Sequence, residues 1–233
     1  MNLRNSRPAP MLGALMSASL IASLAWFQVA TAADTHGVPL PLTLGAGSTV
    51  WLDGTSSLHE FESRTSDFSA RFQRDPATRE PVDVAGLDQL IRTSGVTGLD
   101  VDIPVAAMRS GKSGLDKNMQ KTLKADQFPS IRFQLGRYAL TATSAADTAA
   151  VQAEGTLTVA GHERPSTLNA RAYRSAQGVW VEGTQSLLMT DFGIRPPTMM
   201  LGALKVGDRV TVHYRLLLVP ASAGAGPQSN RTN

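Results

Sequence analysis

Short runs of alternating hydrophobic and polar residues recur along most of the chain. In the clearest run, Ile131, Phe133 and Leu135 alternate with polar residues or glycine, and a second run covers residues 210–216. A period of two places one side of a strand in a dry interior and the other side in solvent. With turn residues between them, these runs predict a mainly β fold of about eight antiparallel strands. The expected strands fall within residues 48–53, 57–72, 98–104, 130–140, 151–160, 166–173, 179–190 and 208–219.

One segment follows a helical period instead. Over residues 113–126, the residues Leu115, Met119 and Leu123 are spaced four apart and form one apolar stripe. We expect Ser113 to cap this helix together with Asp116, three residues further on. The sequence therefore predicts an amphipathic helix of about three turns that lies against the sheet through its apolar stripe.

A second, shorter helix is expected over residues 86–92, with Leu87, Leu90 and Ile91 on its buried side. The strands around these two helices close into a barrel or pack as a two-sheet sandwich. Local pattern does not separate these two architectures.

The two ends of the chain lack both periods. Residues 1–33 combine the charged residues Arg4 and Arg7, an apolar run over residues 11–29 and a final Ala-Thr-Ala-Ala, which is typical of a cleaved secretion signal. A retained membrane anchor is the weaker alternative, because no basic flank follows the apolar run. We therefore expect an exported, soluble mature chain with no stable membrane span. Residues 34–47 are predicted to be a flexible leader, residues 48–219 the folded domain and residues 220–233 a disordered tail.

Composition narrows the functional classes. The net charge is +3, and Arg4 and Arg7 supply two of those charges in a signal segment without acids, which leaves +3 − 2 = +1 on the mature chain. Basic residues form no block, so nucleic-acid binding is not expected. Cysteine is absent, which excludes disulfides and thiolate chemistry.

The sequence shows no catalytic or metal-binding arrangement. The four histidines have no ligand spacing, and no serine lies in a nucleophile elbow. Asp100 and Asp102 share one face of an expected strand, where solvent-facing acids are common. His59 is expected on a strand face shared with Ser57 and Phe61, in a structural role. We therefore expect a non-enzymatic protein without cofactor or metal, and the alternative is an enzyme that uses His59 with a carboxylate.

The apolar stretch over residues 187–202 differs from the expected strands in its methionine, proline and glycine content. It contains Met189, Met199 and Met200, and Pro196-Pro197 forms a rigid corner where the chain should leave the sheet. Methionine fits irregular apolar shapes, so this stretch suits either a gap in the core or the wall of a hydrophobic pocket.

An ordered series of motifs resembles the YceI-like family of polyisoprenoid-binding, lipocalin-like periplasmic proteins. It covers about residues 48–219 and comprises residues 52–61 (LDGTSSLHEF), 100–104 (DVDIP), 128–133 (FPSIRF), 155–162 (GTLTVAGH), 189–197 (MTDFGIRPP) and 206–208 (VGD).

This resemblance implies an antiparallel, lipocalin-like β-barrel of about eight strands with one or two short helices. It further implies non-covalent binding of a long isoprenoid or similar amphiphilic lipid in the lumen, for example a quinone-like or polyprenyl-phosphate lipid. We expect a closed barrel whose ligand-binding residues are Phe61, Phe133, Met189, Phe192, Ile194, Arg195 and His59, the last two near the polar head. The alternative is an envelope barrel with a filled lumen that acts by binding a partner protein.

Overall fold

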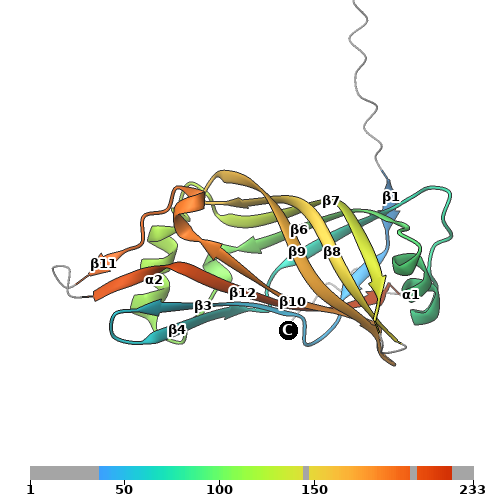
Figure 1. Cartoon of the computed structure of the whole chain (residues 1–233), viewed down its shortest axis with the longest axis horizontal. Helices are drawn as coiled ribbons and strands as arrows, with labels where there is room; N and C mark the ends of the chain where they lie inside the picture. The colour runs from blue at the N-terminus through green and yellow to red at the C-terminus, as the bar shows by residue number, and fades with distance from the viewer. Residues whose placement is uncertain (1–36, 144–146, 200–203, 222–233) are drawn as a thin grey trace, which may run out of the picture. The chain divides into compact units, whose positions relative to one another are not determined.

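The computed structural model describes residues 37–143, 147–199 and 204–221. The predicted signal segment and residues 222–233 of the predicted tail lie outside the described residues. The described chain is mainly antiparallel sheet with two α-helices and two short 3₁₀ helices (Figure 1). In chain order the elements are β1 (Val38–Leu40), β2 (Leu42–Leu44), β3 (Thr49–Ser56), β4 (Glu60–Thr65), β5 (Ser69–Arg74), α1 (Val84–Arg92), β6 (Val96–Pro104), η1 (Val105–Ala107), α2 (Ser113–Thr122), β7 (Ser130–Ala142), β8 (Thr148–Val159), β9 (His162–Arg174), β10 (Val179–Leu188), η2 (Met189–Phe192), β11 (Thr198–Met199) and β12 (Leu204–Pro220).

A single curled sheet organises the domain. Its strand order is β1-β5-β6-β7-β8-β9-β10-β12-β3-β4, and β2 and β11 pair with β12. The sheet bends back on itself, which favours the barrel-like architecture over a two-sheet sandwich (Figure 1). The strands beyond the predicted set, β1, β2 and β11, are only two or three residues long.

The curled sheet is not closed by continuous strand pairing, in contrast to the closed barrel that the sequence suggested. Within the described residues, the path of paired strands ends at β1 and at β4. Beside β4, the chain leaves β6 at Pro104 and turns into η1, so that a single bridge between Arg64 and Arg109 forms there. The sheet is therefore a curled half-barrel with a seam next to β4.

The predicted flexible leader also differs from the structure. Two short strands, β1 and β2, lie within residues 34–47, where the sequence suggested flexibility. β1 pairs with β5, β2 pairs with β12, and Leu40 and Leu42 are buried with 4% and 9% exposure. Three-residue strands give no readable period, because partner strands and burial of two leucines hold them in place. At the other end, Pro220 closes β12, and the Ala221 N–H donates to the Pro41 carbonyl at 2.8 Å.

The β6–β7 pair confirms the expected alternation. Val101 pairs with Phe133, and both side chains point to the interior, whereas Asp102 pairs with Arg132 on the outside. The Arg132 Nε donates to Asp102 Oδ2 at 2.9 Å, and the Gln134 amide donates to Asp100 at 3.2 Å. The two aspartates are thus solvent-facing partners of β7.

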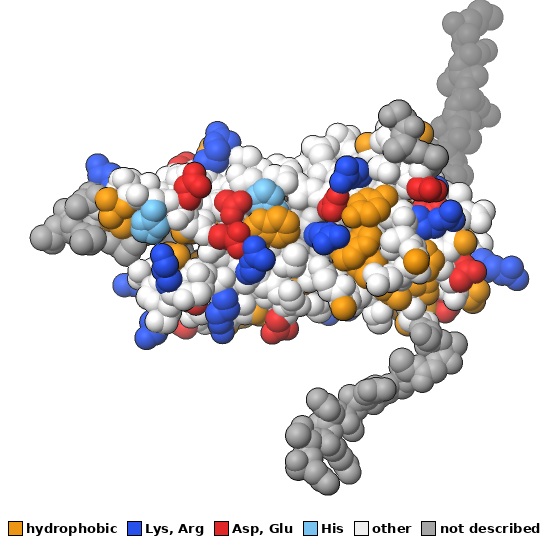
Figure 2. Space-filling view, turned by 90° about the horizontal axis from the view of Figure 1, so that it is seen from below, with side chains coloured by type: hydrophobic (Ala, Val, Ile, Leu, Met, Phe, Trp, Pro, Cys, Tyr) orange, Lys and Arg blue, Asp and Glu red, His pale blue; other side chains and the backbone are white. Residues whose placement is uncertain are grey.

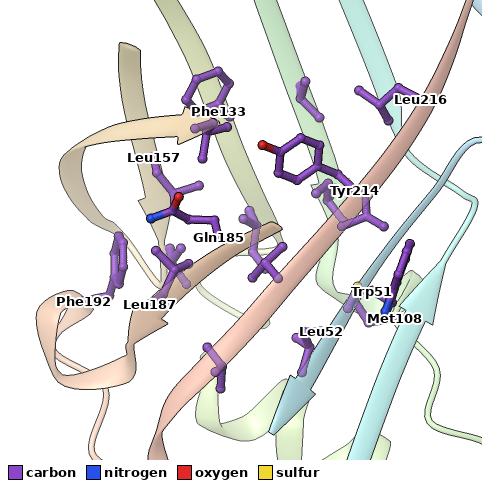
Figure 3. Close-up of a pocket in the computed structure, with 18 of the residues that line it drawn as sticks. Trp51, Leu52, Met108, Phe133, Leu157, Gln185, Leu187, Phe192, Tyr214 and Leu216 are labelled. Atoms are coloured by element: carbon purple, nitrogen blue, oxygen red, sulfur yellow. The ribbon is translucent and has the colours of Figure 1, made fainter. Parts of the chain in front are cut away.

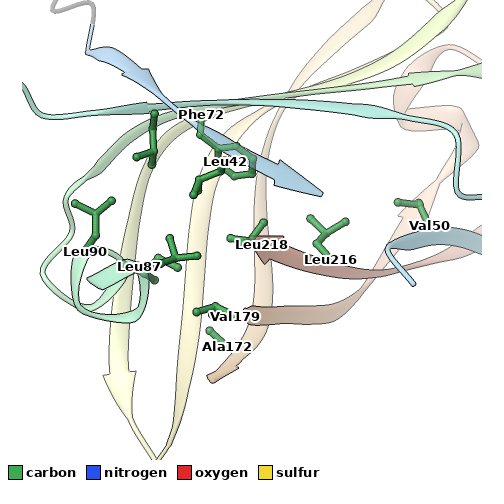
Figure 4. Packing of buried hydrophobic residues seen from close by; sticks show 11 residues of the cluster. Leu42, Val50, Phe72, Leu87, Leu90, Ala172, Val179, Leu216 and Leu218 are labelled. Atoms are coloured by element: carbon green, nitrogen blue, oxygen red, sulfur yellow. The ribbon is translucent and has the colours of Figure 1, made fainter. Parts of the chain in front are cut away.

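Helix α1 buries the three residues predicted from its pattern, Leu87, Leu90 and Ile91. The Asp83 side chain caps its first turn by accepting a hydrogen bond from the Gly86 N–H at 2.8 Å. These leucines join a core cluster with Phe72 and Leu218, so α1 fills one end of the half-barrel (Figure 4).

Helix α2 lies at the opposite end of the sheet from α1 (Figure 1). It is shorter than the predicted 113–126, and its capping differs. Ser113 is the first helical residue, whereas the Asp116 carboxylate accepts hydrogen bonds from both the N–H and the hydroxyl of Ser110. Asp116 is therefore tied to the preceding loop, a pairing six residues apart that a capping box does not describe.

The outer surface carries charges of both signs. On the face shown in Figure 2, basic and acidic side chains are interspersed, and neither sign forms a block. Within the described ranges, no helix is both long and apolar enough to cross a membrane.

Candidate functional site

The half-barrel encloses an apolar cavity of ≈ 330 Å³. Side chains from the curled sheet and from α2 line it, and Leu157 on β8, Leu187 on β10 and Leu216 on β12 point into it (Figure 3). Among the described residues, no aspartate, glutamate, lysine, arginine or histidine lines this space. Its volume falls at the lower end of the range for small-molecule sites, about 300–1,000 Å³.

Strand alternation explains why the wall is apolar. On β12, Val210, Val212 and Tyr214 line the cavity, whereas the intervening His213 lies on the outer face. There the His213 Nε2 lies 2.9 Å from Asp53 Oδ2, and its Nδ1 lies 3.1 Å from the Thr184 hydroxyl. This row of hydroxyl, imidazole and carboxylate is separated from the cavity by the sheet itself.

The two ends of the cavity differ in packing. At the α1 end, Leu87 is completely buried and Leu90 and Ile91 nearly so. At the other end, the predicted stripe of α2, Leu115, Met119 and Leu123, lines the cavity, yet no residue of this helix is fully buried. A half-buried apolar stripe follows from facing an open space rather than a packed core. The α2 end is thus the more loosely packed one.

The polar groups of the wall are few and mostly occupied. The Tyr138 hydroxyl donates to the Ile91 carbonyl at 2.8 Å, and the Tyr214 hydroxyl donates to the Asn169 carbonyl at 2.9 Å. Burial raises the pKa of both phenols to about 12. Because backbone carbonyls satisfy these hydroxyls, the two rings offer the cavity chiefly their apolar surfaces. The Gln185 amide also reaches the wall and donates to the Ser186 carbonyl at 3.3 Å (Figure 3).

The structure brings together five of the seven predicted site residues. The five that line the cavity are Phe61, Phe133, Met189, Phe192 and Ile194. Pro197 also lines it, and residues 194–197 lie outside the sheet, as the double proline indicated. The side chains of Met199 and Met200 lie outside the described residues.

His59 and Arg195 are not part of the wall. Both are exposed. His59 precedes β4 in the β3–β4 turn rather than on a strand, and its carbonyl accepts hydrogen bonds from the N–H and the hydroxyl of Ser56. Residues 57–59 between the two strands interrupt the alternation, so the face that a continuous strand would share with Phe61 does not exist.

One carboxylate outside the cavity holds the methionine-rich stretch in place. Asp208 on β12 accepts hydrogen bonds from the Thr190 N–H at 2.9 Å and from the Thr190 hydroxyl at 2.6 Å. These bonds lower the Asp208 pKa and fix η2, which carries Met189 and Phe192 into the wall. Asp208 thereby links two of the family-like motifs, residues 189–197 and 206–208.

Sequence reasoning missed the wall residues Tyr138, Tyr214 and Gln185. The alternation of β12 already placed Tyr214 inside, so this signal was available. Gln185 carries no such signal, because an amide on the inner face breaks the apolar pattern of β10.

Comparisons with known proteins agree on the fold. A family model described as the YceI-like domain matches residues 43–218. Similar solved structures include BcnA of Burkholderia cenocepacia, with a TM-score of 0.56 and 16% identity; the match covers 75% of this chain and 98% of that one. They also include a polyisoprenoid-binding domain from Saccharophagus degradans, with a TM-score of 0.56 and 14% identity; the match covers 78% of this chain and 99% of that one. No curated protein sequence matches. Because the family model spans well over half of the chain, from β3 through most of β12 with both α-helices, this protein belongs to the YceI-like domain family.

Proposed function

We propose that this protein carries or sequesters a long-chain isoprenoid or similar amphiphilic lipid, held non-covalently in the cavity. The observation that carries the proposal is a cavity of ≈ 330 Å³ whose described lining contains no charged residue. Such a space excludes ions and favours a hydrocarbon tail, because burial of apolar surface is its main source of binding energy.

The expected affinity follows from the length of the buried tail. Each buried methylene contributes about 0.8 kcal/mol, so ten of them give about 8 kcal/mol. Before the cost of ordering tail and protein, this corresponds to a dissociation constant of about 1 μM. The related Saccharophagus structure, described as a polyisoprenoid-binding domain, supports an isoprenoid as the tail.

The residues proposed to contact the tail are Phe61, Phe133, Met189, Phe192 and Ile194, which line the cavity. No covalent step and no cofactor is part of this proposal. The competing hypothesis of a filled lumen and a partner protein is less well supported, since the interior retains open volume. The enzyme hypothesis is weakened by the position of His59, in a turn and away from the cavity.

Native mass spectrometry of the protein purified from its host tests the proposal directly. We expect an adduct of lipid mass that organic extraction removes, and the extracted compound should contain an isoprenoid chain. An adduct-free protein that also fails to take up farnesol, a fifteen-carbon isoprenoid alcohol, would contradict a carrier role.

We further propose that the protein acts in the periplasm after loss of residues 1–33. The support is the three-part pattern of the first 33 residues, which ends in Ala-Thr-Ala-Ala. N-terminal sequencing of periplasmic protein should begin after Ala32 or Ala33. A chain that still starts at Met1 and sediments with membranes would refute export and cleavage.

A further inference from the structure

A second, polar groove adjoins the apolar cavity at the α2 end. It has a volume of ≈ 470 Å³ and lies between β4, the loop after η1 and the start of α2. Phe61 and Leu115 line both the groove and the cavity, so these two side chains form the boundary between them. A ligand that lies across this boundary would have an apolar part on one side and a polar part on the other.

The groove contains the charges that the cavity lacks. Of its basic residues, Arg64 comes from β4, and Arg109 and Lys112 come from the loop between η1 and α2; its acids are Glu60 and Glu62. In the described cavity wall no charged side chain occurs. The lining therefore changes from uncharged in the cavity to charged in the groove across Phe61 and Leu115.

The charges of the groove are not all equally available. The Arg64 guanidinium is paired with Glu62 at 2.6 Å, and this hydrogen bond lowers the Glu62 pKa. Arg109 donates to the carbonyls of Ala106 and Met108, which hold the guanidinium in place without neutralising its charge. Nearby, Asp116 is occupied by two hydrogen bonds from Ser110.

Two cations and one acid then remain for a ligand. With Arg64 and Glu62 paired, the charged residues that remain in the lining are Arg109, Lys112 and Glu60, a net charge of 2 − 1 = +1. The Asp116 carboxylate lies just outside this lining and adds a negative charge close to Arg109. Exposed cations bind phosphate through charge-assisted hydrogen bonds, and an arginine held by its own backbone contacts is ready-placed for this.

We propose that this groove binds the phosphate headgroup of an isoprenoid phosphate whose tail occupies the adjoining cavity, with Arg109 and Lys112 as its cationic partners. The inference rests on the proposed lipid-binding function and specifies the ligand class. A quinone head differs in this respect, because its ring carries no charge and gains little from two cations. A phosphate cannot enter the cavity without losing its hydration, so the groove is the place for it.

The test compares two ligands that differ only in the headgroup, farnesyl monophosphate and farnesol, by calorimetric titration at low salt. Four proteins are used: wild type, Lys112→Gln, Glu60→Gln and the control Lys117→Gln, which changes an exposed lysine of α2 outside both spaces. All four are checked for unchanged circular dichroism.

We expect wild type to bind the phosphate about tenfold more tightly than the alcohol. Lys112→Gln should reduce this preference about two- to fivefold and Glu60→Gln should increase it by a similar factor, while farnesol binding stays constant. Lys117→Gln should match wild type, and added salt should shrink the preference.

Equal binding of the two ligands by wild type, with farnesol still bound, overturns the headgroup site and leaves the carrier function intact. A preference that responds to Lys117→Gln as much as to Lys112→Gln also overturns it, because the effect would then be one of general surface charge. Inorganic phosphate should compete only weakly; competition as strong as that of farnesyl monophosphate would assign the groove to free phosphate instead. Binding of neither lipid would refute both proposals together.

Discussion

Filling the cavity should make the protein more stable and a poorer lipid binder. Ala153 on β8 lines the cavity, where it pairs with Tyr138 on one side and Leu168 on the other. Replacement of Ala153 by leucine extends three additional carbon atoms into the open space. In a tightly packed core the same change causes strain, so its effect reports whether the space is open in solution.

The magnitude follows from the added carbons. Three buried methylene equivalents give at most about 2.4 kcal/mol. The wall position is already partly enclosed, and ordering a leucine side chain costs about 0.5–1 kcal/mol, so we expect a net gain in unfolding free energy of about 1–2 kcal/mol. For a domain of this size, the melting temperature should rise by about 2–8 °C. The same carbons displace tail atoms from the cavity, which should weaken farnesol binding by up to about 50-fold.

Guanidinium denaturation measures the first effect, and titration with farnesol measures the second. The matched control is Ala150→Leu on the exposed face of the same strand, which should change both quantities little. The result that would refute the reasoning is a loss of stability in Ala153→Leu together with unchanged farnesol affinity. That outcome would mean that the interior is packed in solution and that lipid binds elsewhere.

Three further outcomes are expected. Phe192→Arg and Met189→Arg should each abolish farnesol binding while the far-UV circular dichroism stays that of a folded sheet, and undiminished binding by both folded variants would place the ligand outside this cavity. Leu123→Ala should lower the unfolding free energy by about 1–2 kcal/mol, less than the 2–5 kcal/mol of a fully buried leucine because this side chain is half-buried, and an unchanged denaturation midpoint would show that α2 is not docked. Because the pKa values of Tyr138 and Tyr214 are raised to about 12 from 10 in the folded state, the unfolded chain loses its phenolic protons first; stability should therefore fall between about pH 10 and pH 12, and the double Phe variant should lose less stability over that range.

The inner faces of the strands could be predicted from the sequence because their information is local. The alternation around Phe133 and Tyr214 identified which side chains point inward, and the pattern of Leu87 and Leu90 identified the helix that fills one end. The helix at the other end was also predicted, although its cap was assigned to Ser113 and not to the bond between Asp116 and Ser110. A spacing of two or four residues suffices for such inferences.

What the sequence did not predict depends on distant partners. β1 and β2 exist because β5 and β12 bind them, and nothing in three residues reveals that. The groove assembles Arg64, Arg109 and Lys112 from segments up to 48 residues apart, so no motif marks it. His59 was misplaced because a turn and an irregular strand have similar composition over a few residues.

The unequal packing of the two ends of the half-barrel leaves the cavity closed at the α1 end and more loosely covered at the α2 end. At the α1 end, Ile91 lines the cavity and the buried Leu87 and Leu90 belong to the same core cluster, whereas at the other end the side chains of α2 remain half-buried. In the proposed binding mode, with the headgroup at the α2 end, we expect the tail to advance only as far as Ile91 and any further isoprene units to remain outside. The length of the cavity should therefore limit how much of the tail is buried: lipid affinity should rise with chain length until the tail reaches α1 and stay level for longer chains.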